Sequence, residues 1–269
     1  MIENYGVTKK NGPLSEVLRI KESISLKGFS IVKNAFDLDK AKQFGLVLDK
    51  ILPQQERHFS KEELAMIKEE DIVRMPLAYD SIFLELVTDP LIRAVVESLL
   101  GNYYILHLQN GIINKPAKVH HQTSWHRDLP YQDFVSTEPL GINAFLCIDE
   151  FSITSGATFL LPFSHKIPYF PSEEYVKENE VQLIAPPGSI VFFDSMIFHK
   201  AGVNTGNFVR RGINTMFVRP ILKQQIDIPE LLQGKYGDNE FLKKVLGYES
   251  VVAKNVEDYR RRRLTKIRK

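Results

Sequence analysis

The sequence predicts a mainly β protein with flanking helices, in which the strands form an antiparallel sandwich or jelly roll. Six β-rich stretches follow one another between Tyr103 and Arg219 at irregular spacing. Turn signals such as Pro186-Pro187-Gly188 and Asn204-Thr205-Gly206 separate them. No helical pattern is apparent between the stretches, which excludes the regular alternation of strands and helices that a parallel sheet requires.

Helical patterns are expected toward the two ends of the chain. Residues 13–27 place apolar side chains on one helical face and end at Gly28, after which Phe29–Val32 alternates like a short strand. An acidic first turn at Asp37–Lys40 opens a second helix, and a further apolar helix ends at Gly101. Helical patterns return near the C-terminus.

The expected strands divide the chain into three parts. The strands are Tyr103–Ile113, Leu140–Asp149, Thr158–Leu161, Val181–Ile184, Ser189–Asp194 and Gly212–Arg219. We expect one domain, with a helical N-terminal extension over 1–102 that packs on the core, a β core over 103–220 and a helical tail over 221–269. Because strands distant in sequence face each other in a jelly roll, the start and the end of this core are expected to meet.

Composition narrows the class of protein. Hydrophobic residues make up 43% of the 269 residues, which suffices for a sizeable core. No apolar run approaches the roughly 18 residues of a membrane span, and the N-terminus lacks the apolar segment of a signal peptide. The single Cys147 excludes an intramolecular disulfide. These features predict a cytoplasmic protein without a membrane span.

The net charge of +2 is unevenly distributed. Tyr259 to Lys269 carries seven cationic side chains and no acidic one, which leaves −5 on the other 258 residues. A globally basic nucleic-acid-binding surface is therefore not expected. The basic run could contact nucleic acid or anionic lipid, but a solvated helix end, where cations complement the helix dipole, is the simpler interpretation.

His126 and Asp128 have the clearest potential for chemistry. In an extended backbone, side chains two residues apart point to the same side, so these two converge while Arg127 points away. With His199 as a second histidine they would form a 2-His-1-carboxylate face, which leaves metal positions open and suits non-haem iron(II). The triplet alone is a weak signal, since a loop histidine and an N-capping aspartate would look the same. A kinase catalytic loop is excluded, because the other kinase motifs are missing.

Arg210 is a candidate for binding a co-substrate. Eleven residues separate it from His199, and the turn at Asn204-Thr205-Gly206 lets the next strand run back beside His199. A 2-oxo acid on such a metal has a distal carboxylate, which an arginine binds through two parallel charged hydrogen bonds. Alternatively, Arg210 is a surface residue on a strand edge, like its neighbour Arg211.

Several motifs between about Leu106 and Pro220 occur in a specific order. They are Ile113-Asn114-Lys115-Pro116, His126-Arg127-Asp128-Leu129 followed by Tyr131, Gly156 to Lys166 (Gly-Ala-Thr-Phe-Leu-Leu-Pro-Phe-Ser-His-Lys), Pro187 to Phe193, and His199 with Arg210. Together they resemble the phytanoyl-CoA dioxygenase family of iron(II)- and 2-oxoglutarate-dependent oxygenases. No single motif would suffice for this resemblance.

The resemblance implies a double-stranded β-helix core, of the jelly-roll or cupin-like kind, and an Fe(II)/2-oxoglutarate-dependent dioxygenase. By resemblance, His126, Asp128 and His199 bind the iron. Arg210 binds the tail of 2-oxoglutarate, and O2 is the other co-substrate.

Three more residues are implied as contacts of the co-substrate. Phe145 occupies an aromatic position of the family, Thr123 a hydroxyl position, and Gln109 lies on an adjacent strand. Each has a simpler interpretation in packing: Phe145 as a core residue, Thr123 as a strand hydroxyl and Gln109 as an interior amide.

Two residues depart from the family pattern. Phe163 replaces the glycine of Pro-Gly-Ser-His, which puts a turn with a positive φ in doubt there. Ala201 stands where relatives often have a serine that could bind the co-substrate, which makes Thr123 more attractive. Asp128 is retained, whereas related halogenases replace this carboxylate, so the resemblance implies hydroxylation or desaturation.

The function expected from these features is hydroxylation of a small-molecule metabolite or biosynthetic intermediate, with release of succinate and CO2. The residues that flank the metal motif are the expected substrate contacts: Trp125, Tyr131, Gln132, Asp133 and Phe134. The alternative is a jelly-roll module that binds a small molecule or sugar without turnover, although the intact ligand set argues against it. A monomer or homodimer is expected. An oxygenase acting on nucleic acid through the basic tail is a weaker hypothesis.

Overall fold

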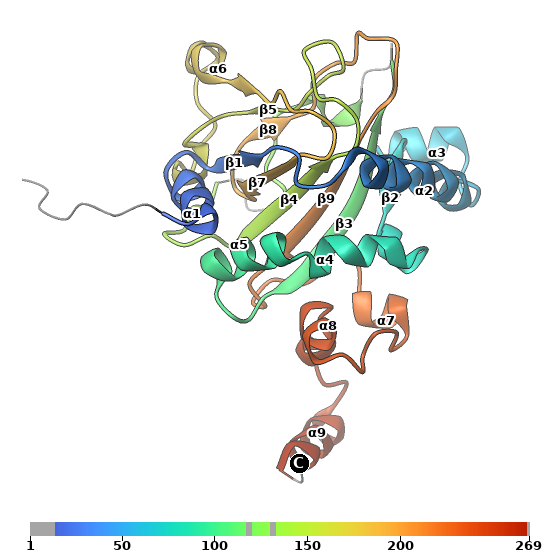
Figure 1. The fold of residues 1–269 in the computed structure, drawn as a ribbon. Coiled ribbons are helices and arrows are strands. Elements are labelled where there is room, and N and C mark those ends of the chain that lie inside the picture. The colour runs from blue at the N-terminus through green and yellow to red at the C-terminus, as the bar shows by residue number, and fades with distance from the viewer. Residues whose placement is uncertain (1–13, 117–119, 130–132, 268–269) are drawn as a thin grey trace, which may run out of the picture.

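The computed structural model describes residues 14–116, 120–129 and 133–267 as a mixed architecture of helices and two antiparallel sheets (Figure 1). The larger sheet has the order β1-β7-β4-β9-β3-β2. Its strands are β1 (Phe29–Val32), β2 (Ile72–Arg74), β3 (Ile105–Asn114), β4 (Gly141–Cys147), β7 (Ile190–Asp194) and β9 (Arg210–Val218). The smaller sheet, β6-β5-β8, contains β5 (Phe159–Leu160), β6 (Val181–Gln182) and β8 (His199–Lys200).

The six core strands expected from the sequence are confirmed with slightly shifted ends, but β2 and β8 were not predicted. Both are too short, at three and two residues, for alternation to be recognised. The expectation that no helix interrupts the strands was wrong, because α6 (Glu173–Asn179) lies between β5 and β6. Its N-cap, Ser172, accepts a hydrogen bond from the Tyr175 N–H, and two glutamates in the first turn complement the helix dipole.

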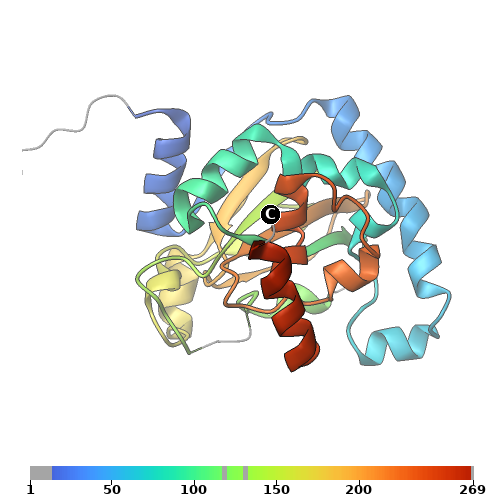
Figure 2. The same ribbon diagram turned by 90° about the horizontal axis from the view of Figure 1, so that it is seen from below.

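Helices cover one face of the larger sheet. They are α1 (Glu16–Lys27), α2 (Leu38–Glu56), α4 (Glu85–Thr88) and α5 (Pro90–Leu100), and the teal helices α4 and α5 cross this face in Figure 2. The short helix α3 (Lys61–Met66) follows α2 at the periphery (Figure 1). The largest apolar cluster joins Phe44 of α2 and Val95 of α5 to Ile213 and Phe217 of β9. The helix expected before Gly28 is confirmed, since Gly28 ends α1 with a left-handed φ of 94°.

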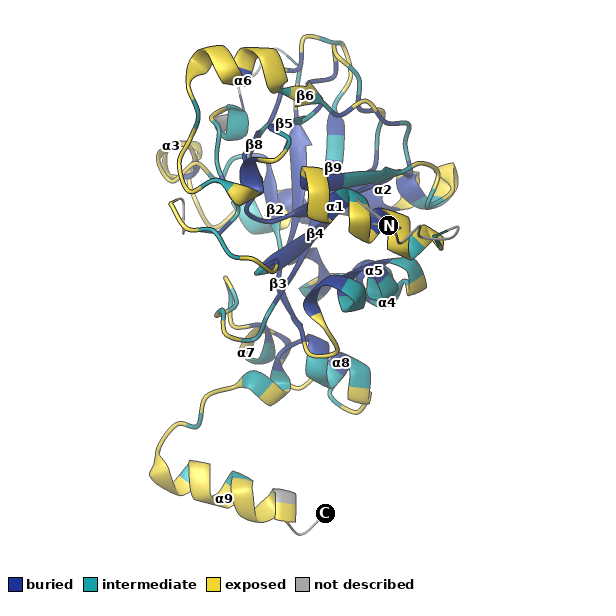
Figure 3. Cartoon of the chain, turned by 90° about the vertical axis from the view of Figure 1, so that its left-hand side faces the viewer, coloured by how far each residue is buried: buried dark blue, intermediate teal, exposed yellow. Residues whose placement is uncertain are grey.

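The C-terminal helices differ in how they contact the rest of the chain. They are α7 (Ile228–Leu232), α8 (Glu240–Val245) and α9 (Val256–Ile267), with short 3-10 helices elsewhere at Pro76–Ala78, Ser81–Leu84, His121–Thr123, Ser164–Lys166 and Tyr248–Ser250. Ile228 and Val245 are buried in the largest apolar cluster, whereas α9 stands apart and is mostly exposed (Figure 3). Arg261 and Arg262 pair with acidic residues one turn earlier in α9. No described helix is both long and apolar enough to cross a membrane.

The opposite face of the larger sheet looks toward the smaller sheet. A second apolar cluster fills the space between them, with Phe145 and Phe193 from the larger sheet and Leu160 from the smaller one. Because side chains alternate along β9, Arg210 and Asn214 point to this inner face while Ile213 points to the helices. The inner face is therefore where a site between the sheets can form.

Candidate functional site

The structure brings His126, Asp128 and His199 together from distant parts of the chain. The backbones of His126 and His199 exchange two hydrogen bonds of 3.0 Å, and the Asp128 N–H donates to the Ser195 carbonyl at 3.2 Å. One potential ligand atom from each of the three residues lies within 4.8 Å of the others. We call these three residues the His-Asp-His group. The predicted convergence of their side chains is confirmed.

Backbone carbonyls orient both imidazoles of this group. Nδ1 of His126 lies 2.9 Å from the Ser124 carbonyl oxygen, and Nδ1 of His199 lies 3.0 Å from that of Ile197. Because a carbonyl only accepts, each Nδ1 is the protonated donor, which leaves Nε2 of the neutral ring as an acceptor. Nε2 lies 3.4 Å from Asp128 Oδ1 for His199 and 3.9 Å for His126. The group thus presents two nitrogens and one oxygen to a common point.

The Asp128 carboxylate is held by amides as well as by the imidazoles. Its Oδ2 accepts hydrogen bonds from Asn143 Nδ2 at 2.5 Å and from Asn214 Nδ2 at 3.1 Å. Burial raises the pKa of Asp128, but attraction to His199 and the hydrogen bonds outweigh it, so the net pKa lies below its ordinary value. Burial lowers the pKa of His199, and Asp128 more than compensates, so that pKa lies above its ordinary value.

Arg210 supplies a buried positive charge to the same inner face. Its side chain is 1% exposed, its Nη2 donates to the Gly156 carbonyl at 2.8 Å, and its guanidinium lies 4.5 Å from the centroid of the Phe151 ring. Burial lowers the pKa of Arg210 to about 10, although Cys147 and Asp149 act to raise it. It therefore stays charged at neutral pH. Within the described residues its Nε has no hydrogen-bond partner and the guanidinium has no carboxylate partner.

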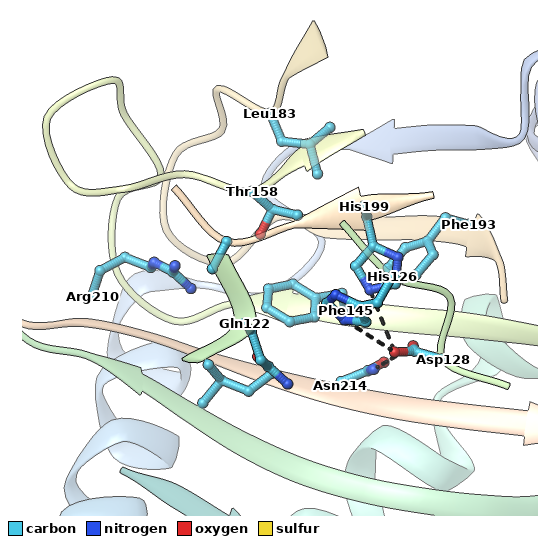
Figure 4. Close-up of a pocket in the computed structure, with 12 residues that line it drawn as sticks. Gln122, His126, Asp128, Phe145, Thr158, Leu183, Phe193, His199, Arg210 and Asn214 are labelled. Atoms are coloured by element: carbon cyan, nitrogen blue, oxygen red, sulfur yellow. Dashed lines mark hydrogen bonds and ion pairs between the residues drawn. The ribbon is translucent and has the colours of Figure 1, made fainter. Parts of the chain in front are cut away.

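One pocket joins Arg210 to the His-Asp-His group. Figure 4 shows them on two sides of a common space, with Phe145 and Thr158 between them. The walls are largely apolar, from Ile112, Phe145, Leu183 and Phe193. Gly212 leaves room for the Phe145 ring, since a Cβ at residue 212 would lie 2.6 Å from a ring carbon. The space is thus polar at its two ends and apolar along its sides.

Only some of the residues expected to contact the co-substrate line the pocket. Phe145 and Ala201 line the pocket. Thr123 does not line it; the preceding residue, Gln122, does. The hydroxyl that the structure places in the lining belongs to Thr158, which sequence reasoning overlooked because it was assigned only to a strand.

Gln109 points away from the pocket. Its amide nitrogen, Nε2, donates to the Phe83 carbonyl at 3.1 Å and to Thr215 Oγ1 at 3.3 Å, on the face covered by helices. The alternation of β3 explains this, because Ile112 lines the pocket and a residue an odd number of positions away faces the other side. The interpretation of Gln109 as an interior amide is the one that fits.

The three expected substrate contacts that the structure describes do not line the pocket. Trp125 alternates with His126 and packs instead against an apolar cluster near α6 that contains Phe198, with the Lys200 ammonium 4.5 Å from its ring. Asp133 and Phe134 are exposed and lie outside the lining. The remaining two, Tyr131 and Gln132, lie outside the described residues.

The doubt about a turn at Phe163 was unfounded. Phe163 adopts a φ of 66°, so the left-handed turn is kept without a glycine. Its N–H donates to the Lys27 carbonyl at 3.0 Å, and its side chain is 57% exposed. A left-handed conformation costs a non-glycine residue about 1–2 kcal/mol, which the surrounding hydrogen bonds offset.

Sequence reasoning also missed Asn143 and Asn214. Both are polar residues within apolar strands, and both share a face with a residue that had been singled out: Asn143 with Phe145, and Asn214 with Arg210. This two-residue periodicity was the available signal.

The chain is similar in sequence and in fold to several known proteins. A model of the phytanoyl-CoA dioxygenase (PhyH) family matches residues 24–212. The uncharacterized protein Rv1501 of Mycobacterium tuberculosis is 31% identical over 257 residues, which is 90% of each chain. The iron/alpha-ketoglutarate-dependent dioxygenase penM of Penicillium thymicola is 24% identical over 182 residues, 60% of this chain and 57% of that protein. A crystal structure of the epimerase SnoN with Fe3+, alpha ketoglutarate and nogalamycin RO has a similar fold, with a TM-score of 0.60 at 16% identity over 80% of this chain and 88% of that one.

Proposed function

The chain belongs to the phytanoyl-CoA dioxygenase family, and from this premise we propose that it is an iron(II)- and 2-oxoglutarate-dependent dioxygenase that hydroxylates a small molecule. One observation carries the proposal: a His-Asp-His group and a buried guanidinium, which has no carboxylate partner among the described residues, line one pocket. The printed name of penM and the ligands of SnoN support the same pair of cofactors.

The His-Asp-His group has the donor set that iron(II) needs. Two neutral imidazole nitrogens and one carboxylate oxygen are the ligands of non-haem iron sites that keep positions open for other ligands. The Nδ1 hydrogen bonds of His126 and His199 orient both rings so that Nε2 faces the carboxylate. His126, Asp128 and His199 would therefore hold the metal.

The Arg210 end of the pocket fits the distal carboxylate of 2-oxoglutarate. A buried guanidinium with an unused Nε–H is unfavourable unless a charged acceptor reaches it. A carboxylate accepts from arginine through two parallel charged hydrogen bonds. The Thr158 hydroxyl lines the same space and would donate a further hydrogen bond to the co-substrate. Phe145 would pack along its carbon chain.

Bound iron and 2-oxoglutarate together would let O2 oxidise a C–H bond of the substrate, with succinate and CO2 as co-products. The chain contributes orientation and exclusion of water. Ile112, Phe145, Leu183 and Phe193 form an apolar wall around the reacting space. Asp128 occupies the position that halogenases leave free of a carboxylate, which favours hydroxylation.

The fold proposed for this activity is a double-stranded β-helix. The two antiparallel sheets enclose a shared apolar cluster, and the bridge between His126 and His199 links the start of the core to its end. The likeness to SnoN supports the same assignment of the fold.

Formation of succinate tests the function. Purified protein is incubated with Fe(II), ascorbate, 2-oxoglutarate and O2 in the presence of a panel of small molecules, and succinate is quantified. We expect succinate above the level of the His199→Ala variant, and more of it when a molecule is hydroxylated. Equal succinate from wild type and His199→Ala across the panel, with metal bound, would favour a binding module without turnover.

A further inference from the structure

We propose that Asn143, Asn214 and Ser195 are positioning residues that make Asp128 present a single carboxylate oxygen to the metal. This inference rests on the proposed function, because it concerns the same metal face. It assigns a role to three buried polar residues that lie outside the sequence motifs. They come from β4, from β9 and from the turn after β7.

A closed ring of hydrogen bonds carries the inference. The Asp128 N–H donates to the Ser195 carbonyl, Ser195 Oγ donates to Asn143 Oδ1 at 2.6 Å, and Asn143 Nδ2 donates to Asp128 Oδ2 at 2.5 Å. The ring therefore ties the backbone and the carboxylate of Asp128 to the same serine. The Asp128 side chain cannot rotate without breaking one of these bonds.

Asn214 adds a second support to the same oxygen. Its Oδ1 accepts from Asn143 Nδ2 at 2.9 Å, and its Nδ2 donates to Asp128 Oδ2 at 3.1 Å. The ring leaves only one orientation for each amide. The Asp128 carboxylate only accepts, so both asparagines must turn a nitrogen toward Oδ2. Asn143 Oδ1 then faces Ser195, whose hydroxyl donates to it. A reversed amide on either asparagine would set acceptor against acceptor.

Burial makes this network rigid. Asn143 and Ser195 are fully buried and Asn214 is 7% exposed, so water does not replace a broken bond cheaply. Gly141 keeps the space for the serine, because a Cβ at that position would lie 2.8 Å from Ser195 Oγ.

The consequence concerns how the metal is coordinated. Both amide donors bind Oδ2, while Oδ1 faces Nε2 of both histidines. A carboxylate whose second oxygen is engaged in this way binds a metal through one oxygen, which preserves the open positions that a co-substrate and O2 need. If Oδ2 were released, the carboxylate could chelate the metal and take up one of those positions.

Cobalt(II) binding tests the inference without reliance on turnover. Co(II) alone is titrated into wild type, Asn143→Ala, Asn214→Ala and Ser195→Ala, and affinity is measured by calorimetry and coordination by the visible d–d absorption. For the asparagine variants we expect affinity to fall about 10-fold or more, together with a changed d–d spectrum. Ser195→Ala removes one hydroxyl only, so a smaller change in the same direction is expected.

The matched control is Thr215→Val. Thr215 follows Asn214 in β9, is fully buried and accepts a hydrogen bond from Gln109 on the opposite face of the sheet. Its loss disturbs the same strand without touching Asp128. We expect wild-type Co(II) affinity and an unchanged spectrum for this variant, even if its thermal stability falls.

The outcomes separate this inference from the proposed function. If Co(II) binds wild type but not His199→Ala, and the folded Asn143, Asn214 and Ser195 variants match wild type in affinity and spectrum, the positioning role is wrong and the metal site stands. If wild type and His199→Ala bind Co(II) alike, the metal site itself is wrong, and the inference falls with it. Should the asparagine variants fail to fold, Ser195→Ala alone decides by the same criteria.

Discussion

The two ends of the pocket differ in how far the chain satisfies its own polar groups. At one end, Asp128 has amide donors on Oδ2 and imidazoles near Oδ1. At the other, Arg210 Nη2 donates to the Gly156 carbonyl, and its Nε has no hydrogen-bond partner in the part of the chain that the structure describes. We infer that the protein alone completes the hydrogen bonding of the His-Asp-His end, whereas a bound anion would complete that of the guanidinium end. Variants at the two ends of the pocket test this contrast.

Removal of one imidazole should abolish tight metal binding by the His-Asp-His group. His199→Ala deletes a donor from a preformed face, so Fe(II) affinity, measured anaerobically by calorimetry, should fall by more than about 100-fold, which exceeds the loss typical of outer positioning residues. The exposed His58 provides the control, and His58→Ala should bind Fe(II) like wild type. Wild-type Fe(II) affinity in His199→Ala would contradict the assignment of His199 as a metal ligand.

Adjacent arginines allow the other end to be tested separately. Arg210→Met should weaken 2-oxoglutarate binding to the metal-loaded protein by roughly 10–100-fold, because charged hydrogen bonds contribute about 1.5–3 kcal/mol. Without co-substrate its thermal stability should not fall, since a buried unpaired charge is removed. Arg211, on the opposite face, pairs with Asp149 and Asp49.

Arg211→Met is therefore the matched control, with the opposite pattern. It should lower the free energy of unfolding by about 1–2 kcal/mol through loss of charged hydrogen bonds and leave the 2-oxoglutarate affinity unchanged. Denaturant unfolding and calorimetry measure the two quantities. The contrast between the two faces fails if Arg211→Met weakens the binding of 2-oxoglutarate as much as Arg210→Met does.

The two ends should also respond differently to pH. The pKa of His199 is raised by Asp128 despite burial, so protons compete with metal at Nε2 as the pH falls. Fe(II) affinity should be constant above that pKa and decrease by up to about 10-fold per pH unit below it. The sign for the metal-free protein is the reverse: the raised pKa stabilises the fold at low pH, and this contribution is lost as the pH rises through it.

Arg210, in contrast, has a pKa of about 10 and keeps its charge between pH 6 and 8. The affinity of metal-loaded protein for 2-oxoglutarate should therefore show no titration of this group across that range. Calorimetric titrations at several pH values check both statements. A metal affinity that rises as the pH falls would contradict the assignment of Nε2 as a metal donor.

The smallest effect concerns two threonines. Thr158 lines the pocket and Thr123 does not. Thr158→Ala should raise the dissociation constant of 2-oxoglutarate by roughly 3–10-fold, as expected for one neutral hydrogen bond of about 1 kcal/mol. Thr123→Ala should stay within experimental error of wild type in the same titration. The reverse order would restore the interpretation of Thr123 as the co-substrate hydroxyl.

The sequence predicted the parts of the site that depend on local spacing. His126 and Asp128 converge because they are two residues apart in an extended segment, and Arg210 and Arg211 face opposite ways because they are adjacent in a strand. The same alternation predicts that Trp125 points away from His126. Its place next to the motif in the sequence nevertheless made it an expected substrate contact. Local periodicity was thus more informative than closeness in sequence.

Contacts between separate strands could not be predicted in this way. The bonds among Asn143, Asn214 and Ser195 depend on the order of β4, β9 and β7 in the sheet, which no short pattern encodes. The direction of Gln109 depends on which of the two alternating sets of β3 side chains faces the smaller sheet, and the pairing of β3 with β9 fixes this. A one-residue slip moves a side chain to the opposite face.

An anaerobic titration shows whether iron and the keto acid bind together in this pocket. Fe(II)-loaded protein is titrated with 2-oxoglutarate under anaerobic conditions, and the visible charge-transfer absorption of the metal–keto acid complex is followed. We expect this band to saturate at one equivalent of 2-oxoglutarate in wild type and to be lost in His199→Ala. In Arg210→Met, saturation of the band should need a higher concentration of 2-oxoglutarate. A wild-type protein that binds Fe(II) but shows no such band at saturating 2-oxoglutarate would contradict it.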